Sequence, residues 1–192
     1  GLERWESGQD AVALVLHNGP EYLEAMLGAY RARAVPFNVN QHYRPAEVAS
    51  LFADLGVRAV VYHRAYGPLV AAACESAGIG EVVLVEVDDG GPSLGDRAVP
   101  YTGLLDAHQP FDRIERSGDD IYMLYTGGTT GMPKGVMYPM ADITGFFARL
   151  GFQAAGLPVP EAASDLAPMV RDLAASGTTP VSITGAPLMH GT

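Results

Sequence analysis

The residues at positions 125–135 carry the side chains best suited to chemistry in this sequence. They read YTGGTTGMPKG, so four glycines, three threonines and one lysine lie close together. Glycine lets backbone amides approach a ligand closely, threonine hydroxyls add hydrogen-bond donors, and lysine adds a mobile positive charge. These groups suit the anionic oxygens of a polyphosphate, and we therefore interpret the stretch as a candidate phosphate-binding loop.

The order of residues in this loop is more informative than its glycine content, because glycine, threonine and proline also form ordinary turns. Pro133 precedes Lys134 and Gly135 follows it, whereas the P-loop pattern GxxxxGK[ST] needs Ser or Thr after the lysine. The dinucleotide-binding pattern GxGxxG is also absent. An ordinary turn without a ligand is the alternative that stays open.

Composition and charge limit the class of protein. The chain has 192 residues, of which 48% are hydrophobic and 18% charged, and this balance predicts a folded globular protein. A net charge of −10 argues against nonspecific binding to nucleic acid or to an anionic membrane. No apolar run has membrane-spanning length and the first residues lack a signal-peptide pattern, so we expect a cytoplasmic protein without a transmembrane segment. Whether it forms a homo-oligomer stays open.

Apolar runs of strand length alternate with segments of helical periodicity along the chain. Strands are predicted at residues 11–16, 35–39, 57–62, 82–87, 121–125, 136–138 and 181–184. Helices are predicted at residues 21–33, 45–55, 67–77, 101–107, 142–150 and 161–175. The alternation predicts an α/β fold with mainly parallel sheets flanked by helices. Such sheets bind ligands at the carboxyl ends of their strands, and the glycine-rich loop follows a predicted strand.

Single residues mark the expected helix ends. Pro45 is expected to begin a helix, and Asn18 is a candidate cap for the helix at 21–33. Gly56 and Gly78 are expected to end helices in the left-handed conformation. Gly8 is expected to do the same for a short helix at residues 2–7.

Other reactive residue types form no recognisable site. The five histidines contain no HxxxH pair and Cys74 is the single cysteine, so a protein-bound structural metal is not expected. Cys74 is expected to be buried and inert, and the GxSxG pattern of serine hydrolases is absent. Asp119 and Asp120 resemble an acid–base pair, but neighbouring strand residues point to opposite faces. We therefore interpret both as solvated loop charges.

The loop resembles the signature loop of the adenylate-forming enzymes, the superfamily of acyl-CoA synthetases, peptide-synthetase adenylation domains and luciferases. The superfamily pattern, roughly [YF][TS][SG]G[ST][TS]GxPKG, is met at every position. Residues 187–190, PLMH, resemble the PLxH-type segment that follows the loop in acyl-CoA synthetases. Residues 32–40, ARAVPFNVN, are similar to the superfamily's AGAVxVPLN stretch, with Arg33 where glycine is usual.

This resemblance implies a reaction and a set of site residues. A carboxylate attacks the α-phosphate of ATP, pyrophosphate leaves, and the thiol of coenzyme A captures the acyl-adenylate. Lys134 is implied as the catalytic charge partner of the phosphates, Thr126 as a contact of Mg²⁺, and His190 as a catalytic residue near the acyl pocket. The residues implied to bind the nucleotide are Thr126, Gly127, Gly128, Thr129, Thr130, Gly131 and Lys134. ATP, Mg²⁺ and coenzyme A are the implied cofactors and co-substrates.

The resemblance also implies which part of an enzyme this chain represents. Residues 1–192 correspond to a partial large N-terminal domain of an adenylate-forming enzyme, that is, an incomplete AMP-binding domain with the C-terminal domain absent. We therefore expect an acyl-CoA synthetase as the parent protein and no activity from this chain alone. YTGGTTGMPKGVM and PLMHGT most resemble bacterial fatty-acyl or steroid-side-chain CoA ligases, which predicts a hydrophobic carboxylic acid as substrate. The alternatives are an amino-acid or aryl-acid adenylation domain, a nucleotide-binding module without transfer chemistry, and an interaction domain.

Overall fold

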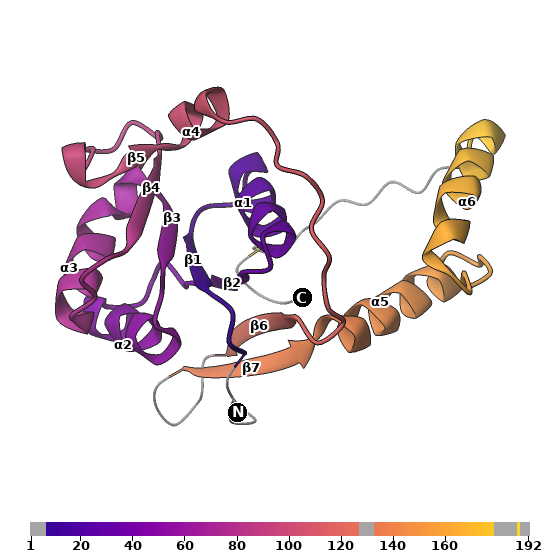
Figure 1. Cartoon of the computed structure of the whole chain (residues 1–192), viewed down its shortest axis with the longest axis horizontal. Coiled ribbons are helices and arrows are strands. Elements are labelled where there is room, and N and C mark those ends of the chain that lie inside the picture. The colour runs from indigo at the N-terminus through magenta and orange to yellow at the C-terminus, as the bar shows by residue number, and fades with distance from the viewer. Residues whose placement is uncertain (1–6, 127–132, 179–187, 189–192) are drawn as a thin grey trace.

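Five strands build the main sheet of the molecule, for which a computed structural model describes residues 7–126, 133–178 and 188. The strand order is β2-β1-β3-β4-β5, and every pair of neighbours is parallel (Figure 1). The strands are β1 Ala11–Val15, β2 Val35–Asn38, β3 Ala59–His63, β4 Val83–Val87 and β5 Val99–Pro100. The predicted parallel α/β architecture is confirmed.

Helices connect these strands, and proline and glycine mark their ends. They are α1 Pro20–Arg31, α2 Pro45–Leu55, α3 Gly67–Ala77 and α4 Tyr101–Ala107, with short 3-10 turns η1 Arg64–Tyr66 and η2 Gly95–Arg97. Gly56 and Gly78 follow α2 and α3 with φ of 56° and 65°, as predicted, because glycine adopts this conformation without strain. The N-cap of α1 is Gly19 rather than Asn18. The Asn18 side chain instead accepts a hydrogen bond from the backbone N–H of Leu188.

Apolar side chains fill the space on both faces of the main sheet. On one face α2 and α3 cover the strands, and Phe37, Phe52 and Tyr62 are fully buried there. On the other face α1 and α4 lie over the sheet, and Leu14 and Tyr22 are buried. Because helices cover both faces, the strands read as nearly continuous apolar runs.

The strand before the glycine-rich loop belongs to a separate hairpin. β6 Ile121–Thr126 and β7 Lys134–Pro139 pair antiparallel in a two-stranded sheet. The predicted strand is confirmed, but the expected position of the loop at the carboxyl edge of the parallel sheet is corrected. The segment at residues 127–132 is short enough to join antiparallel neighbours, whereas parallel neighbours need a crossover of about a dozen residues or more. Met123 of β6 is buried in the same core as Phe37 of β2.

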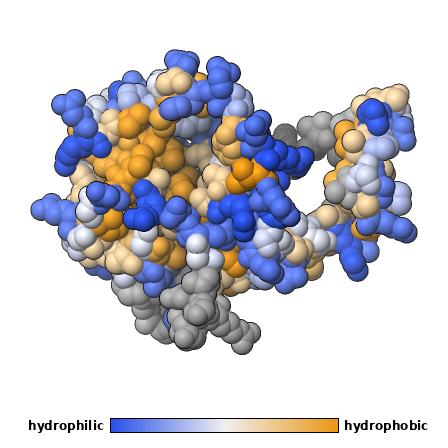
Figure 2. Space-filling model, in the orientation of Figure 1, coloured by the Kyte–Doolittle hydropathy of each residue, from blue (hydrophilic) through white to orange (hydrophobic). Residues whose placement is uncertain are grey.

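Two helices after the hairpin form an arm that extends away from the main sheet (Figure 1). They are α5 Met140–Ala154 and α6 Ala163–Ser176. Both helices were predicted, and α5 is longer at both ends than expected. Figure 2 shows apolar and polar residues side by side on the arm. Its exposed large apolar side chains include Phe146, Phe147, Leu150 and Val170.

Some expectations concern the edges of the described structure. Gly8 has φ of 66°, which fits a helix stop, while residues 1–6 and 179–187 lie outside the described residues. The helix predicted at 2–7 and the strand predicted at 181–184 therefore stay predictions. Cys74 is only partly buried, and burial raises the pKa of its thiol, in keeping with an inert residue. Within the described ranges, no helix combines the length and apolar character needed to span a bilayer.

Candidate functional site

Thr126 and Lys134 face each other at the loop end of the β6–β7 hairpin. They are partners in the last register position before the glycine-rich segment, and both residues are exposed. Lys134 is the single lysine of the chain, and it makes no ion pair with any residue in the described part of the structure. Its positive charge is therefore available to an anionic ligand beside the loop.

The structure places only part of the predicted site. Thr126 and Lys134 are brought together as register partners, and their roles in phosphate binding stay predictions. The other predicted binding residues, Gly127, Gly128, Thr129, Thr130 and Gly131, and the predicted catalytic residue His190 lie outside the described residues. Their roles stay predictions.

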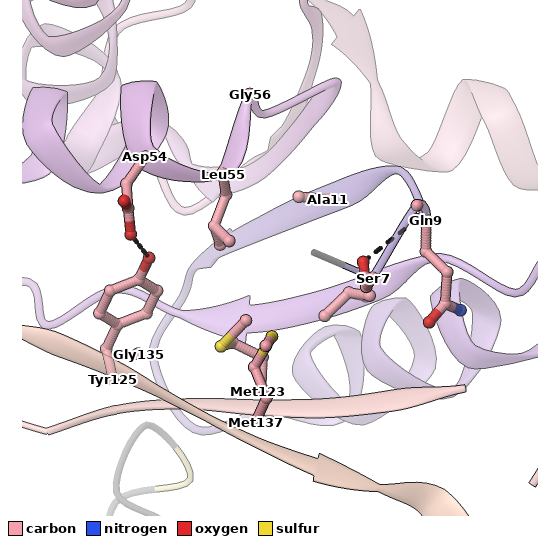
Figure 3. Close-up of a pocket in the computed structure, with 12 residues that line it drawn as sticks. Ser7, Gln9, Ala11, Asp54, Leu55, Gly56, Met123, Tyr125, Gly135 and Met137 are labelled. Carbon is pink, nitrogen blue, oxygen red and sulfur yellow. Dashed lines mark hydrogen bonds between the residues drawn. The ribbon is translucent and has the colours of Figure 1, made fainter. Parts of the chain in front are cut away.

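Tyr125 attaches the loop end of the hairpin to the main sheet. Its hydroxyl donates a hydrogen bond of 2.7 Å to Oδ2 of Asp54 in α2 (Figure 3). Its ring centroid lies 5.7 Å from that of Phe37. Burial, and after it the hydrogen bond to Asp54, raises the pKa of the Tyr125 phenol above its usual range. Tyr125 is therefore a neutral donor at physiological pH, and its contacts hold the strand next to the loop.

Gly135 lies opposite Tyr125 and makes room for its ring. A Cβ atom at Gly135 would stand 3.1 Å from Sδ of Met123 and 3.2 Å from Cζ of Tyr125. Real Cβ atoms rarely approach so closely, so another residue would push the ring or the thioether aside. The last glycine of the YTGGTTGMPKG stretch therefore has a steric role in the hairpin.

Two cavities border the hairpin and share Asp54, Tyr125 and Gly135 in their walls. The larger, of about 660 Å³, lies between the main sheet and the hairpin and also includes Met123 and Met137 (Figure 3). The smaller, of about 460 Å³, is lined by Ser50, Leu51, Asp54, Tyr125, Pro133, Lys134 and Gly135. The Asp54 carboxylate and the Lys134 ammonium group therefore both border the smaller cavity.

Asp54 and Ser50, which line the smaller cavity beside Lys134, were not identified from the sequence. Both lie on α2, whose apolar periodicity explains the helix but contains no signal for a polar contact with β6. Asp54 and Tyr125 are 71 positions apart in sequence, so only the fold brings them together.

Asp120 also differs from its sequence interpretation. Only 9% of the residue is exposed, and its carboxylate accepts hydrogen bonds from Nε and Nη2 of Arg33, the shortest of 2.8 Å. The interpretation as a solvated charge is wrong, because Asp120 lies where the hairpin meets the turn between α1 and β2. Asp119 is exposed, as expected. The two carboxylates therefore do not act as a pair.

A second polar cluster, of His17, His63 and Tyr66, lies at the carboxyl ends of β1 and β3. The backbone N–H of His17 donates to Nδ1 of His63 at 3.1 Å, and the Tyr66 hydroxyl lies 3.0 Å from Nε2 of His17. Burial, and after it the nearby His17, lowers the pKa of His63. The part of the chain that is described contains no group of three or more His, Cys, Asp or Glu residues that could hold a metal ion.

The chain belongs to the AMP-binding enzyme family, because residues 6–189 match that family. It is 39% identical over 97% of its length to the medium-chain acyl-CoA ligase Mig of Mycobacterium avium, of which it covers 33%. It is 37% identical over 70% of its length to a 3-oxocholest-4-en-26-oate CoA ligase of Rhodococcus rhodochrous, of which it covers 24%. The chain thus spans about a third or less of the length of these curated relatives.

Solved structures of a CoA ligase and an acyl-CoA synthetase share the fold of this chain. An acyl-CoA synthetase of Brucella canis superimposes with a TM-score of 0.64 and 25% identity, over 78% of this chain and 27% of that one. An anthranilate CoA ligase in complex with anthranoyl-AMP superimposes with a TM-score of 0.66 and 21% identity, over 74% of this chain and 27% of that one. The parallel sheet flanked by helices is therefore the fold of this family.

Proposed function

We propose that this chain is the phosphate-binding part of an acyl-CoA synthetase. The parent protein would use ATP to convert a hydrophobic carboxylic acid into an acyl-adenylate and then into acyl-CoA. The observation that supports this most is the pairing of Thr126 at the loop end of the hairpin with Lys134, which makes no ion pair among the described residues, in a chain of the AMP-binding enzyme family. In this proposal residues 1–192 are an incomplete N-terminal AMP-binding domain that is inactive alone.

The proposed chemistry places the charge of Lys134 beside the departing pyrophosphate. When the carboxylate attacks the α-phosphate, the bond to the pyrophosphate breaks and negative charge builds up on the leaving group. A fixed cation and oriented hydrogen-bond donors stabilise that charge without reorganising during the reaction. We assign the cation to Lys134, and the donors to Thr126, Thr129, Thr130 and the backbone of Gly127, Gly128 and Gly131.

Magnesium and coenzyme A complete the proposed set of reactants. Mg²⁺ keeps most of its waters and binds phosphate oxygens, so it needs few protein ligands, and the exposed Thr126 hydroxyl fits one such contact. We assign His190 to the acyl side of the site. The substrate class follows from the two curated relatives above, which are named for medium-chain and steroid acids.

Nucleotide binding to this chain tests the role of Lys134. ATP affinity is measured by calorimetry for the wild type, for Lys134→Ala, and for Arg149→Ala, which removes an equal charge from the exposed arm. We expect Lys134→Ala to weaken binding by about 5- to 100-fold, as for the loss of a charged hydrogen bond to phosphate, and Arg149→Ala to have no effect. Equal affinities of wild type and Lys134→Ala would show that the loop is only a turn.

The full-length parent tests the reaction itself. ATP–pyrophosphate exchange is measured with fatty, steroid, aryl and amino acids as alternative substrates. Exchange that depends on a fatty or steroid acid supports the proposal, and dependence on an aryl or amino acid would replace the substrate class. A parent that binds ATP but shows no acid-dependent exchange would be a nucleotide-binding module.

A further inference from the structure

Arg33 has an unusual backbone conformation at the turn between α1 and β2. Its φ is 59°, and it is the one non-glycine residue with positive φ in the described part of the chain. A residue with a Cβ atom is disfavoured in this region, so the surrounding structure must hold Arg33 there. Arg33 stands where the similar stretch of adenylate-forming enzymes usually has glycine, and the φ value explains why glycine would fit.

The side chain of Arg33 makes hydrogen bonds with Asp120 that glycine could not make. Its Nη2 lies 2.8 Å from Oδ1 of Asp120, and its Nε lies 3.1 Å from Oδ1 and 3.2 Å from Oδ2. This forked contact sets direction as well as distance, because the planar guanidinium meets the planar carboxylate at two nitrogens. Asp120 directly precedes β6, so the contact ties the α1–β2 turn to the start of the hairpin.

Gln9 makes a second connection between the same two segments. Its Nε2 donates to the backbone carbonyl of Arg33 at 2.7 Å, and its Oε1 accepts from the backbone N–H of Ile121 at 2.9 Å. The backbone carbonyl of Asp120 in turn accepts from the N–H of Met140, the residue after β7. We call the set of Gln9, Arg33 and Asp120 with these bonds the Arg33 clamp. It restrains both strands of the hairpin at the end opposite the loop.

Because β6 is long, a small rotation at the Arg33 clamp produces a large displacement at the loop end of the hairpin. Ile121 and Thr126 are five residue steps apart, which is about 17 Å at about 3.4 Å per residue. A rotation of about 5° at the clamp would move Thr126 and Lys134 by about 1.5 Å, and displacements of this order are enough to impair a binding geometry. Near the loop, Tyr125 holds β6 through its hydrogen bond to Asp54 and its ring contact with Phe37, and the Arg33 clamp fixes the other end of the same strand.

We propose that Arg33 is a positioning residue of the phosphate site, which acts through the Arg33 clamp to set where the hairpin presents Thr126 and Lys134 to a nucleotide. This inference rests on the proposed function, because it assigns a role at the same site. Arg33 itself does not touch the ligand.

Three variants at Arg33 separate the side-chain contact from the backbone conformation. Arg33→Gly removes the guanidinium but suits the positive φ, Arg33→Ala removes it and keeps the unfavourable φ, and Arg33→Lys keeps the charge without the fork. ATP affinity and thermal unfolding are measured for each, at a temperature where every variant is folded. Arg58→Ala, which breaks an exposed ion pair with Asp10 and removes none of the bonds of the Arg33 clamp, is the control.

The expected result is a separation of affinity from stability. Arg33→Gly should weaken ATP binding by about three- to tenfold, because displacement of the hairpin lowers affinity without unfolding it. Arg33→Gly should nevertheless unfold at a higher temperature than Arg33→Ala, because glycine suits the positive φ. Arg33→Lys should recover part of the affinity, and Arg58→Ala should bind like the wild type. Wild-type affinity in a folded Arg33→Gly variant would overturn the inference.

Hydrogen exchange provides a readout that needs no nucleotide. The β6–β7 amides should exchange faster in Arg33→Gly than in the wild type, while the amides of β1 and β3 should not change. Unchanged protection of the hairpin would refute the positioning role even if the chain binds ATP. A wild-type chain without ATP affinity would refute the proposed function instead, and the exchange result would still decide whether Arg33 positions the hairpin.

Discussion

The main sheet and the hairpin with its helical arm are held in different ways. In the main sheet, side chains such as Phe37 and Phe52 are completely buried between strands and helices. In the arm, α5 has no buried residue, and Phe146 is 64% exposed. The hairpin lies between these extremes, because it buries Met123 and packs partly buried apolar side chains against the core, and it also makes polar contacts with Asp54, Arg33 and Gln9.

This contrast shows where function can be adjusted separately from folding. A region held by apolar packing unfolds with the whole domain, whereas a region held by a few directed contacts can shift while the rest stays folded. The candidate phosphate site lies on the second kind of region. Changes in the main sheet should therefore alter stability, and changes at the hairpin contacts should alter ligand affinity first.

The largest effect is expected from the core of the main sheet. Phe52→Ala should lower the free energy of unfolding by about 3–5 kcal/mol, because it leaves a cavity under α2. Phe146→Ala on the arm should change it by less than about 0.5 kcal/mol, because that ring is exposed. Urea unfolding followed by circular dichroism measures both. Equal losses in the two variants would contradict the contrast between sheet and arm.

A smaller effect is expected from two glycines with different surroundings. Gly135→Ala should destabilise the chain by about 1–3 kcal/mol, because the new Cβ would overlap Met123 and the Tyr125 ring. Gly145→Ala should stabilise it by about 0.5–1 kcal/mol, because Gly145 lies inside α5 with open space around it. Thermal unfolding of both variants measures the shifts. A neutral Gly135→Ala would show that the hairpin adapts more easily than its contacts indicate.

The smallest effect is expected from protonation of His63 in the main-sheet region. Its pKa is lowered in the folded state, so it contributes stability above its unfolded pKa of about 6.5 and this stability is lost as pH falls through the folded value. His63→Asn keeps a neutral acceptor for the His17 N–H, so the loss of stability between about pH 7 and pH 5 should be smaller than in the wild type.

The control for this prediction is His42→Asn, which changes an exposed histidine. Unfolding midpoints in urea are compared at both pH values for the wild type and both variants. His42→Asn should follow the pH dependence of the wild type. If His63→Asn follows it as well, the His17–His63 contact does not control the pH response.

Much of the fold is readable from local patterns. Pro45 begins α2 and Gly56 ends it because proline suits the first turn of a helix and glycine suits the left-handed residue after it. The apolar runs of β1, β3 and β4 indicated strands covered on both faces. The hairpin was harder to predict from sequence, because the apolar run at β6 resembles the other strands and nothing within it specifies an antiparallel neighbour.

The candidate site shows the same division between local patterns and contacts of distant segments. Thr126 and Lys134 could be proposed from sequence, because small, hydroxyl and basic residues close together in one stretch are typical of phosphate binding. Asp120 was misread, because its burial depends on Arg33, 87 positions away. Gln9 was missed for the same reason, since it bonds Ile121 from 112 positions away.

Short-range chemistry therefore accounts for the candidate phosphate-binding stretch, the helix ends and the α/β class of this protein, because each depends on residues within a few positions of one another. The antiparallel pairing of β6 with β7 is consistent with the short segment between them. The clamp that restrains the hairpin was decided only by the tertiary structure, because it depends on which distant segments share an interface and no local preference of the chain encodes that choice.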